Sequence, residues 1–324
     1  MTEHSAGMAE HYGDPMAEQK ALVAGTGVVD LSTRGVLTVA GPDRLSWLDT
    51  LSTQWLRDLA PGMSAEALIL SPHGHIEHAL HLVDDGQTSW ITVEPGTADA
   101  LRAHLESMRF MLRVEIADVS SQWAVLGRMS DEPAGDADGP VWRDPWPGPV
   151  GQTATYSDAD PHPGAGWNLV EQLVARDRVA GLLAAAVPAG HWALRALRIA
   201  AWRPQLGAET DHRTIPHELD WLRTAVHLRK GCYRGQETVA RVHNLGRPPR
   251  RLVMLHLDGS EHTLPEPQSA LTLPGGGRSV GRITSVAWHY EQGPIALAVV
   301  KRSLPAETVL HAGSISAAQQ IIVG

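Results

Sequence analysis

Residues 230–237, which read KGCYRGQE, combine the residue types that thiol chemistry needs. Cys232 lies between two glycines of this run, which permit a tight turn and the close approach of a ligand. The cations Lys230 and Arg234 would favour the thiolate over the thiol, and the Gln236 side chain offers hydrogen-bonding groups to a polar ligand. A reactive thiol and an inert, buried cysteine in a structural turn explain the spacing equally well.

Cys232 is the only cysteine among the 324 residues, and this count excludes several kinds of site. One chain with one thiol has no intrachain disulfide and no cysteine-rich zinc site. It also lacks the four thiolates that an iron–sulfur cluster usually takes. The remaining interpretation is a single thiol that is either inert or reactive.

Glu218 ends the stretch 215–218 (IPHE), where a carboxylate after a proline could lie at the mouth of a pocket. Such a carboxylate can accept two hydrogen bonds from an amidine-like edge, for example the 2-amino group and N3–H of a pterin. An exposed surface glutamate is the simpler interpretation of this residue taken alone.

Four histidines close together in the sequence invite a metal-site interpretation. On a strand, His73, His75 and His81 would share one face, while His78 would point to the other. Few carboxylates and no cysteine lie nearby, so the sequence predicts no metal site here.

The first half of the chain alternates short strands with helices. Two helices are expected, one after Asp43 with its leucines on one stripe and one over residues 97–109. The expected strands cover residues 35–40, 65–70, 76–83, 89–93 and 112–116. This mixture of hairpins and crossover helices predicts an α+β fold with largely antiparallel sheets.

Proline, glycine and aspartate dominate residues 131–151, which predicts a loop between two subdomains. A strand near residues 167–170 and helices over 178–186 and 192–201 follow it. Beyond the turn at 246–249 the expected elements are all short strands, which is typical of a small β-barrel. These strands cover residues 251–257, 279–287 and 294–300.

The 27 Lys and Arg residues against 36 Asp and Glu residues give a net charge of −9. This balance argues against general nucleic-acid binding, and the hydrophobic content of 43% is enough for a sizeable core. No apolar run reaches the ~18–20 residues of a membrane span. The N-terminal residues lack the basic and apolar regions of a signal peptide, so we expect a cytoplasmic protein without a membrane partner.

The octapeptide at 230–237, with the TVAR that follows it, resembles the K-G-C-Y-x-G-Q-E signature of the YgfZ proteins. These are folate-binding relatives of the glycine-cleavage T-protein, an aminomethyltransferase. Stretches at 29–35, 215–218 and 281–285 are similar to the family's D-L-S-x-R-G, P-x-E and G-x-I-T-S segments, in the family's order. The resemblance therefore extends over most of the chain.

The resemblance implies a folate-binding domain over residues 1–246, built of two ferredoxin-like subdomains, and a C-terminal β-barrel over residues 247–324. It implies tetrahydrofolate or a one-carbon derivative as the cofactor, bound in a central channel that both subdomains line. Glu218 and Gln236 would contact the folate, and Arg241 would make the channel mouth basic for an anionic polyglutamyl tail. The reactive thiol would lie near this channel.

Aminomethyltransferases carry an acidic pair in a G-G-V-I-D-D stretch, and the matching residues 74–79 read GHIEHA here. The essential aspartate falls on His78 or Ala79, and Glu77 fits only with a shift. A neutral side chain cannot stabilise a developing iminium cation, which favours the YgfZ branch. That branch implies a role in the synthesis or repair of iron–sulfur enzymes, with client or assembly proteins as partners. A true aminomethyltransferase acting on a lipoyl carrier protein and a thiol adaptor that binds no folate remain alternatives.

Overall fold

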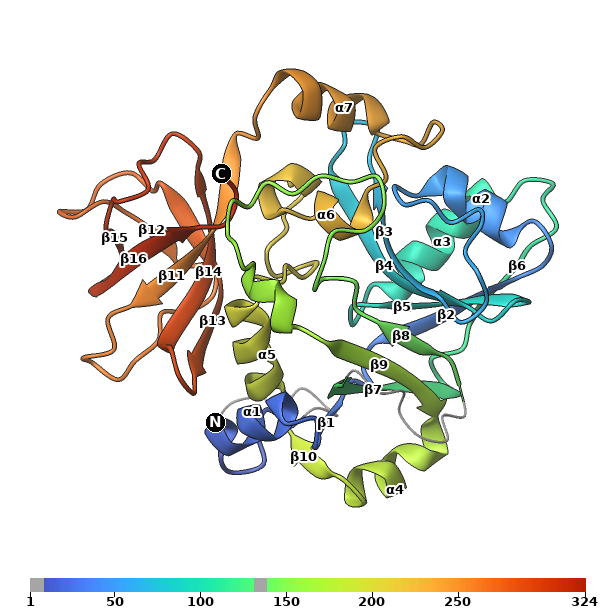
Figure 1. Ribbon diagram of the computed structural model, residues 1–324, viewed down its shortest axis with the longest axis horizontal. Helices are drawn as coiled ribbons and strands as arrows, with labels where there is room; N and C mark the ends of the chain where they lie inside the picture. Colours follow the sequence, from blue (N-terminus) through green and yellow to red (C-terminus); the bar gives the residue numbers. More distant parts are fainter. Residues whose placement is uncertain (1–8, 131–138) are drawn as a thin grey trace.

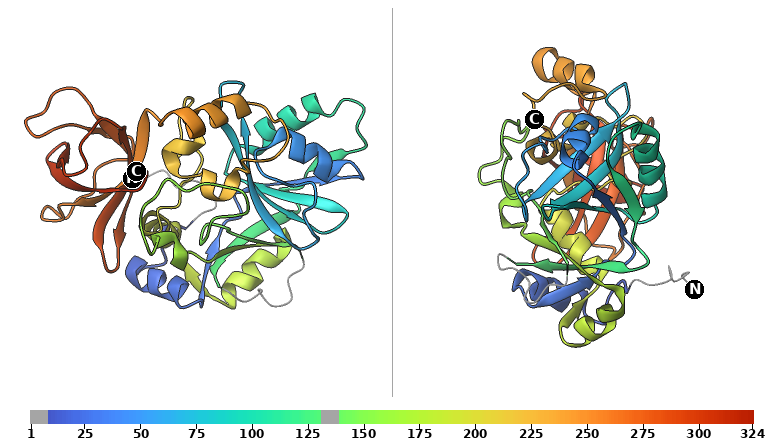
Figure 2. Two further views of the ribbon diagram at one scale, coloured as in Figure 1. Left: turned by 45° about the horizontal axis from the view of Figure 1, so that its top comes forward. Right: turned by 90° about the vertical axis from the view of Figure 1, so that its right-hand side faces the viewer.

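The computed structural model describes residues 9–130 and 139–324, which form three β-sheets with helices packed against them (Figure 1). Residues 131–138 of the predicted inter-subdomain loop and residues 1–8 lie outside this description. Figure 2 shows the C-terminal sheet at one end of the molecule, beside the lobe that the other two sheets form. The architecture is thus a mixed α/β fold, as predicted.

The first sheet is antiparallel and has both faces buried. Its strand order is β3-β4-β5-β2-β6. Alternation along a strand sends Ile69 towards two covering helices and Leu70 towards the centre of the molecule. The strands are β2 (Gly35–Ala40), β3 (Ser64–Leu70), β4 (Ile76–Asp84), β5 (Thr88–Val93) and β6 (Glu115–Asp118), and the helices are α2 (Arg44–Leu51) and α3 (Ala98–Met108).

The second sheet combines strands from widely separated parts of the chain. Its order is β10-β1-β7-β9-β8, and only the β1–β10 pair is parallel. Val29, Val125 and Leu173 of this sheet join the central hydrophobic core. The strands are β1 (Gly27–Asp30), β7 (Trp123–Met129), β8 (Val141–Arg143), β9 (Leu169–Ala175) and β10 (Val187–Ala189); the 3-10 helices η1 (Pro163–Gly166) and η2 (Arg176–Arg178) and helix α4 (Val179–Ala184) flank them.

The third sheet is a nearly closed barrel at the C-terminal end of the chain. Its order is β12-β13-β14-β11-β16-β15, and an isolated bridge from Thr272 to His311 connects its two edges. Alternate apolar side chains of its strands fill the interior. The strands are β11 (Arg250–Leu257), β12 (Ala270–Leu271), β13 (Gly281–His289), β14 (Gly293–Lys301), β15 (Leu310–Ala312) and β16 (Ile315–Ile321).

Five further elements connect the sheets. Helix α5 contacts β13 and β14 of the barrel on one side and β1 and α1 on the other, so it joins the barrel to the rest of the molecule. Helix α7 lies across the top of the molecule (Figure 1). The elements are α1 (Pro15–Val23), α5 (His191–Ala200), η3 (Pro216–Leu219), α6 (Leu222–Ala225) and α7 (Gln236–Leu245).

Two local predictions differ from the structure. The strand expected at 112–116 begins three residues later than predicted: Leu112 is 41% exposed and precedes the strand that pairs with β2, which runs from Glu115 to Asp118. The described part of the predicted loop also contributes to the core, since it forms β8 and buries Trp142 and Trp146 completely. Its Pro and Gly content indicates turns but does not show that two large side chains anchor the segment.

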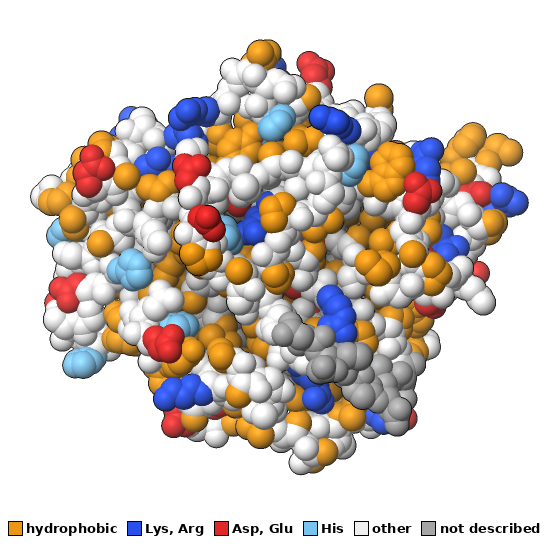
Figure 3. Space-filling view, in the orientation of Figure 1, with side chains coloured by type: hydrophobic (Ala, Val, Ile, Leu, Met, Phe, Trp, Pro, Cys, Tyr) orange, Lys and Arg blue, Asp and Glu red, His pale blue; other side chains and the backbone are white. Residues whose placement is uncertain are grey.

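The surface carries charges of both signs. On the face in Figure 3, Lys and Arg side chains are interspersed with Asp and Glu side chains, without a broad basic area. Among residues 9–130 and 139–324, every helix is too short or too polar to cross a bilayer.

Candidate functional site

A cavity of about 220 Å³ lies where the first two sheets meet α5, and charged side chains line much of its wall. Strand β4 contributes His81 and β9 contributes Glu171, so both sheets take part. Arg34, Glu94 and Arg203 come from the segments after β1, β5 and α5. Because buried charges are costly unless they are paired, the charged residues of this wall need partners.

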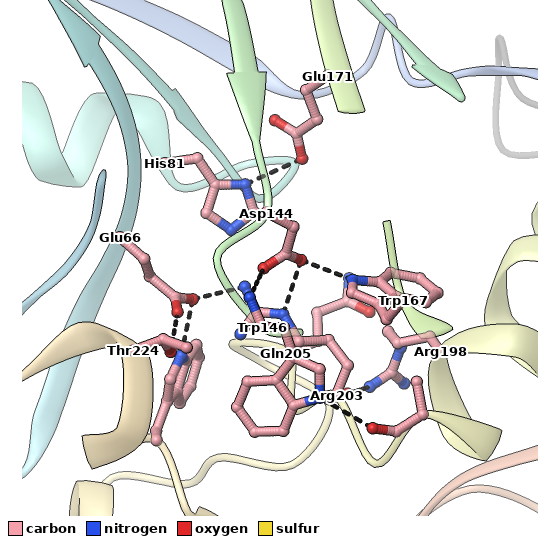
Figure 4. Close-up of polar contacts among 12 residues, drawn as sticks. Glu66, His81, Asp144, Trp146, Trp167, Glu171, Arg198, Arg203, Gln205 and Thr224 are labelled. Carbon is pink, nitrogen blue, oxygen red and sulfur yellow. Dashed lines mark hydrogen bonds and ion pairs between the residues drawn. The ribbon is translucent and has the colours of Figure 1, made fainter. Parts of the chain in front are cut away.

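Glu171 is fully buried in the wall and accepts hydrogen bonds at both oxygens, of which Figure 4 shows the contact with His81. His81 Nδ1 lies 2.9 Å from Oε1, Thr92 Oγ1 lies 2.6 Å from Oε2, and Arg34 Nη1 lies 3.3 Å from Oε1. Burial alone would raise the pKa of Glu171, but Arg34 and His81 outweigh it and lower this pKa to about 2. Arg34 also pairs with Glu94 at 3.2 Å. The carboxylate is therefore a fixed negative charge at neutral pH.

Arg203 is the centre of a second buried network. Its Nε donates to Asp144 Oδ2 at 2.9 Å and its Nη2 donates to Glu66 Oε1 at 2.6 Å. Burial opposes the charge of Glu66, but Arg203 lowers its pKa below the usual range. Burial raises the pKa of Asp144. Arg203 lowers this pKa and Glu66 raises it, and the net shift is upward. The indole rings of Trp146 and Trp221 lie 5.1 and 5.9 Å from the guanidinium carbon.

A third arginine connects the cavity to the barrel. Arg198 of α5 donates through Nη1 to Glu209 at 2.8 Å and through Nη2 to Ser285 of β13 at 2.6 Å. One turn earlier on α5, Arg195 is exposed at the rim of the cavity. The cavity thus has a rigid, charged interior and a basic residue at its edge.

The predicted reactive residue, Cys232, is exposed on the loop before α7. In the part of the chain that the structure describes, no hydrogen bond reaches its sulfur. The glycines on either side of it have different environments. Gly231 has open space where a Cβ would be, whereas Gly235 has φ +82° and would place a Cβ 2.5 Å from the Ser71 carbonyl oxygen. Gly235 is therefore required by close packing against the β3–β4 turn rather than by access to the sulfur.

The two cations of the motif are each paired with groups other than the thiol. Lys230 is buried, and its Nζ donates to the backbone oxygens of Asp49, Ser52 (2.8 Å) and Gln54 (2.6 Å). These carbonyls lie at the carboxyl end of α2, where free acceptors and the helix dipole favour a cation. Arg234 pairs with Glu77 at 3.0 Å.

The predicted folate contacts lie outside the 220 Å³ cavity. Glu218 is 1% exposed, which excludes the surface interpretation, and Arg250 donates to its oxygens at 3.0 and 2.7 Å. Gln236 donates to the Lys230 carbonyl and lines a separate polar cavity of about 390 Å³ under α7. Arg241 is exposed on α7. None of these three predicted residues lies in the central cavity.

The four clustered histidines point to different neighbours. His81 faces Glu171, and the ring of His78 contacts that of His104 of α3 in a tilted arrangement, with 5.8 Å between the ring centroids. His73 and His75 contact each other before β4 begins. Within the described ranges, no group of three or more His, Cys, Asp or Glu side chains has a geometry that could hold a metal ion.

Sequence reasoning missed the charged residues at the cavity. Glu66, the buried partner of the cavity-lining Arg203, lies in the strand sequence SAEALIL, and the cavity-lining Glu171 lies in LVEQLVA; each is surrounded by apolar residues. A carboxylate at an inward position of a buried strand needs a partner, so these two positions carried a usable signal. Arg203 has no such signal, since its neighbours in the sequence resemble those of an exposed loop.

Comparisons with known proteins agree with this architecture. A family model described as the GCVT N-terminal domain matches residues 8–129. A chloroplastic protein of Arabidopsis thaliana with a provisional transferase name is 28% identical over 303 residues, which cover 86% of this chain and 66% of that protein. An aminomethyltransferase of Synechococcus sp. (strain WH7803) is 27% identical over 334 residues, which cover 92% of this chain and 85% of the relative.

A solved structure extends the likeness to the whole fold. The glycine cleavage system aminomethyltransferase T from Bartonella henselae superposes with a TM-score of 0.75 at 18% identity, covering 97% of this chain and 90% of that one. The chain therefore has a T-protein-like fold, and it spans less than two thirds, 66%, of the Arabidopsis protein.

Proposed function

We propose that this chain binds a reduced folate in the 220 Å³ cavity and is not a conventional aminomethyltransferase. One observation carries the second half of the proposal. Of the three positions that could match the transfer acid, Ala79 lines the cavity, His78 contacts the ring of His104, and Glu77 pairs with Arg234 at the surface. None of the three supplies a carboxylate to the cavity, and a developing iminium cation needs one.

The carboxylates that do line the cavity are engaged by arginines. Glu94 and Glu171 share Arg34, and Asp144 is paired with Arg203. A carboxylate whose charge is already compensated stabilises a nearby cation less than a free one does. This supports binding of a heterocycle over aminomethyl transfer.

The cavity fits a tetrahydropterin in chemistry. Its wall combines aromatic surface from Trp167 and Trp221 with hydrogen-bonding groups of both kinds. Buried nitrogens of Arg34 (Nε), Arg198 (Nε) and Arg203 (Nη1) have no partner within the described residues. Such unpaired buried donors are uncommon in folded proteins, and these three belong to residues that line the cavity. Bound folate would supply one-carbon chemistry, while these residues would bind and orient its ring.

The finer part of the proposal follows the resemblance to the YgfZ proteins, with their two ferredoxin-like subdomains over 1–246 and barrel over 247–324. In that role the folate complex supports the synthesis or repair of iron–sulfur proteins, and the exposed Cys232 meets a client or assembly protein. A second candidate, aminomethyl transfer to and from a lipoyl carrier, is favoured by the names of the relatives.

Calorimetric titration with tetrahydrofolate tests the proposal. We expect one molecule bound per chain, with a Kd of about 1–100 μM, and no methylene-tetrahydrofolate formed when an aminomethyl-lipoyl carrier is added. The Glu218→Ala variant should keep its affinity within about twofold, because Glu218 lies outside the cavity. A tenfold loss in that variant would instead support the sequence-based placement of the pterin at Glu218. If tetrahydrofolate does not bind, the interpretation as a thiol adaptor without folate remains. Rapid formation of methylene-tetrahydrofolate would instead establish an aminomethyltransferase.

The Cys232→Ser variant tests the role of the thiol. Because Cys232 is exposed and makes no hydrogen bond through sulfur in the described chain, stability should stay within about 0.5 kcal/mol of wild type. Folate affinity should also be unchanged, yet the variant should fail to restore iron–sulfur enzyme activity in a deletion strain. Full complementation would remove Cys232 from the mechanism.

A further inference from the structure

We propose that Arg195 binds the carboxylates of the folate's glutamyl tail, in a second cavity that continues the 220 Å³ cavity towards the barrel. This inference rests on the proposed folate function and extends it from the ring to the tail. It also gives the tail a different partner from Arg241, the residue that the sequence indicates for this role. Arg241 is exposed on α7 and lines neither cavity.

The second cavity has a volume of about 410 Å³ and lies between α5 and strand β13 of the barrel. It shares part of its wall with the first cavity, so a ligand bound in the first can extend into the second. Figure 4 shows two of the shared residues, Arg198 and Gln205, beside the buried networks. The shared residues are Glu94, Pro95, Arg195, Arg198, Gln205 and Leu206.

The first cavity is too small for a whole folate. Pockets that enclose a drug-sized ligand usually measure about 300–1,000 Å³, and the first cavity measures about 220 Å³. It has room for the bicyclic ring that the proposed function places beside Trp167 and Trp221. The p-aminobenzoyl group and the glutamate must then lie outside it, and the second cavity is the adjoining space.

Arg195 is the cation of the second cavity that is available to a ligand. Its side chain is exposed, so a ligand atom can reach it, and no hydrogen bond or ion pair engages its guanidinium in the part of the chain that the structure describes. Arg198, the other arginine of this wall, is already paired with Glu209. Glu94, the acidic residue of the wall, is likewise paired with Arg34. The uncompensated charge in this cavity is therefore positive.

The surroundings of Arg195 favour an anionic ligand. Burial and the charge of Arg198 lower the pKa of Arg195, and the carboxylates of Glu10 and Glu209 offset only part of this effect. An anion between the two arginines would relieve their repulsion. In a reduced folate the anionic groups at neutral pH are the glutamate carboxylates, which lie at the opposite end of the molecule from the ring. Their planar geometry matches the guanidinium fork.

Calorimetric titrations with tetrahydrofolate and with 6-methyltetrahydropterin, which has the ring but no tail, test the inference. Arg195→Gln should weaken tetrahydrofolate binding about tenfold and leave the affinity for 6-methyltetrahydropterin within about twofold of wild type. An unchanged affinity for tetrahydrofolate, or an equal loss for both ligands, would overturn the role of Arg195 and leave the proposed function intact. Failure of both ligands to bind to the wild-type protein would overturn the proposed function itself.

Two further arginine variants locate the tail. Arg102→Gln, at an exposed site on α3, is the matched control and should bind both ligands as the wild type does. A loss of tetrahydrofolate affinity in Arg241→Gln, with none in Arg195→Gln, would contradict the inference and support the sequence-based placement of the tail.

Circular dichroism and the melting temperature establish that the variants fold. If Arg195→Gln does not fold, the salt dependence of the wild-type protein decides. Raising NaCl from about 50 mM to about 500 mM should weaken tetrahydrofolate binding at least about threefold, because salt screens an accessible ion pair. Binding of 6-methyltetrahydropterin should stay within about twofold over the same range. Equal salt dependence for the two ligands would overturn the inference.

Discussion

Replacement of Arg203 by methionine should destabilise the protein by about 3–5 kcal/mol at pH 7, the usual cost of removing one partner from a buried ion pair. The change leaves Glu66 and Asp144, with side chains at most 1% exposed, without their shared cation. Methionine preserves the packing between Trp146 and Trp221, so the loss reports mainly on charge. Denaturant unfolding followed by circular dichroism measures it.

A second variant separates charge from shape. Adding Glu66→Gln to Arg203→Met should recover part of the loss, because a glutamine still accepts from Trp221 and carries no charge. Arg102→Met, which breaks only a 3.7 Å surface pair with Asp99, should change stability by less than about 0.5 kcal/mol. A loss below about 1 kcal/mol for Arg203→Met would mean that the two carboxylates reach water or take up a proton.

Glu171→Gln should lower the free energy of unfolding by about 3 kcal/mol at pH 7, and this destabilisation should become smaller in acid. The folded-state pKa of about 2 lies below the ordinary value of 4.5, so the unfolded chain binds the proton first as pH falls. The stability that the ionised carboxylate contributes is therefore complete above pH 4.5 and is lost as pH falls towards 2. At pH 3.5 the difference in the free energy of unfolding between wild type and Glu171→Gln should be about 1.4 kcal/mol smaller than at pH 7.

Urea unfolding of both proteins at pH 7 and at pH 3.5 measures this difference. Glu106→Gln is the control, since its 3.8 Å pair with Arg109 is largely exposed and should show little dependence on pH. A difference between wild type and Glu171→Gln that is the same at both pH values would show that the environment of Glu171 does not favour its charge.

Short apolar segments bounded by turn residues predicted the hairpin strands of the first sheet. Residues 65–70, 76–83 and 89–93 correspond closely to β3, β4 and β5, because each turn between them is marked by glycine or aspartate. The strand expected at 112–116 begins three residues too early, because Leu112, Val114 and Ile116 alternate with charged residues although the pairing with β2 starts only at Glu115. The strand expected near 167–170 is longer in the structure and ends at Ala175. Its polar residues Glu171 and Gln172 suggest the end of a strand in the sequence, but both are buried.

The candidate site was harder to predict than the fold. A contiguous motif such as residues 230–237 stands out in a sequence, but its cations serve packing in this structure. The cavity wall instead takes Arg34, Asp144 and Arg203 from positions at least 59 residues apart. Only the arrangement of the sheets places such residues together, and no local pattern records that arrangement.

Lys230 has a consequence for the order of events during synthesis. It satisfies three carbonyls around the end of α2 across 176–181 residues of sequence. Contacts of such long range form late, because the intervening loop must close first. During translation, the carbonyl groups at the end of α2 therefore lack the Lys230 donor until residue 230 has left the ribosome. Until then, the segment that matches the GCVT N-terminal domain, 8–129, lacks a contact of its native structure.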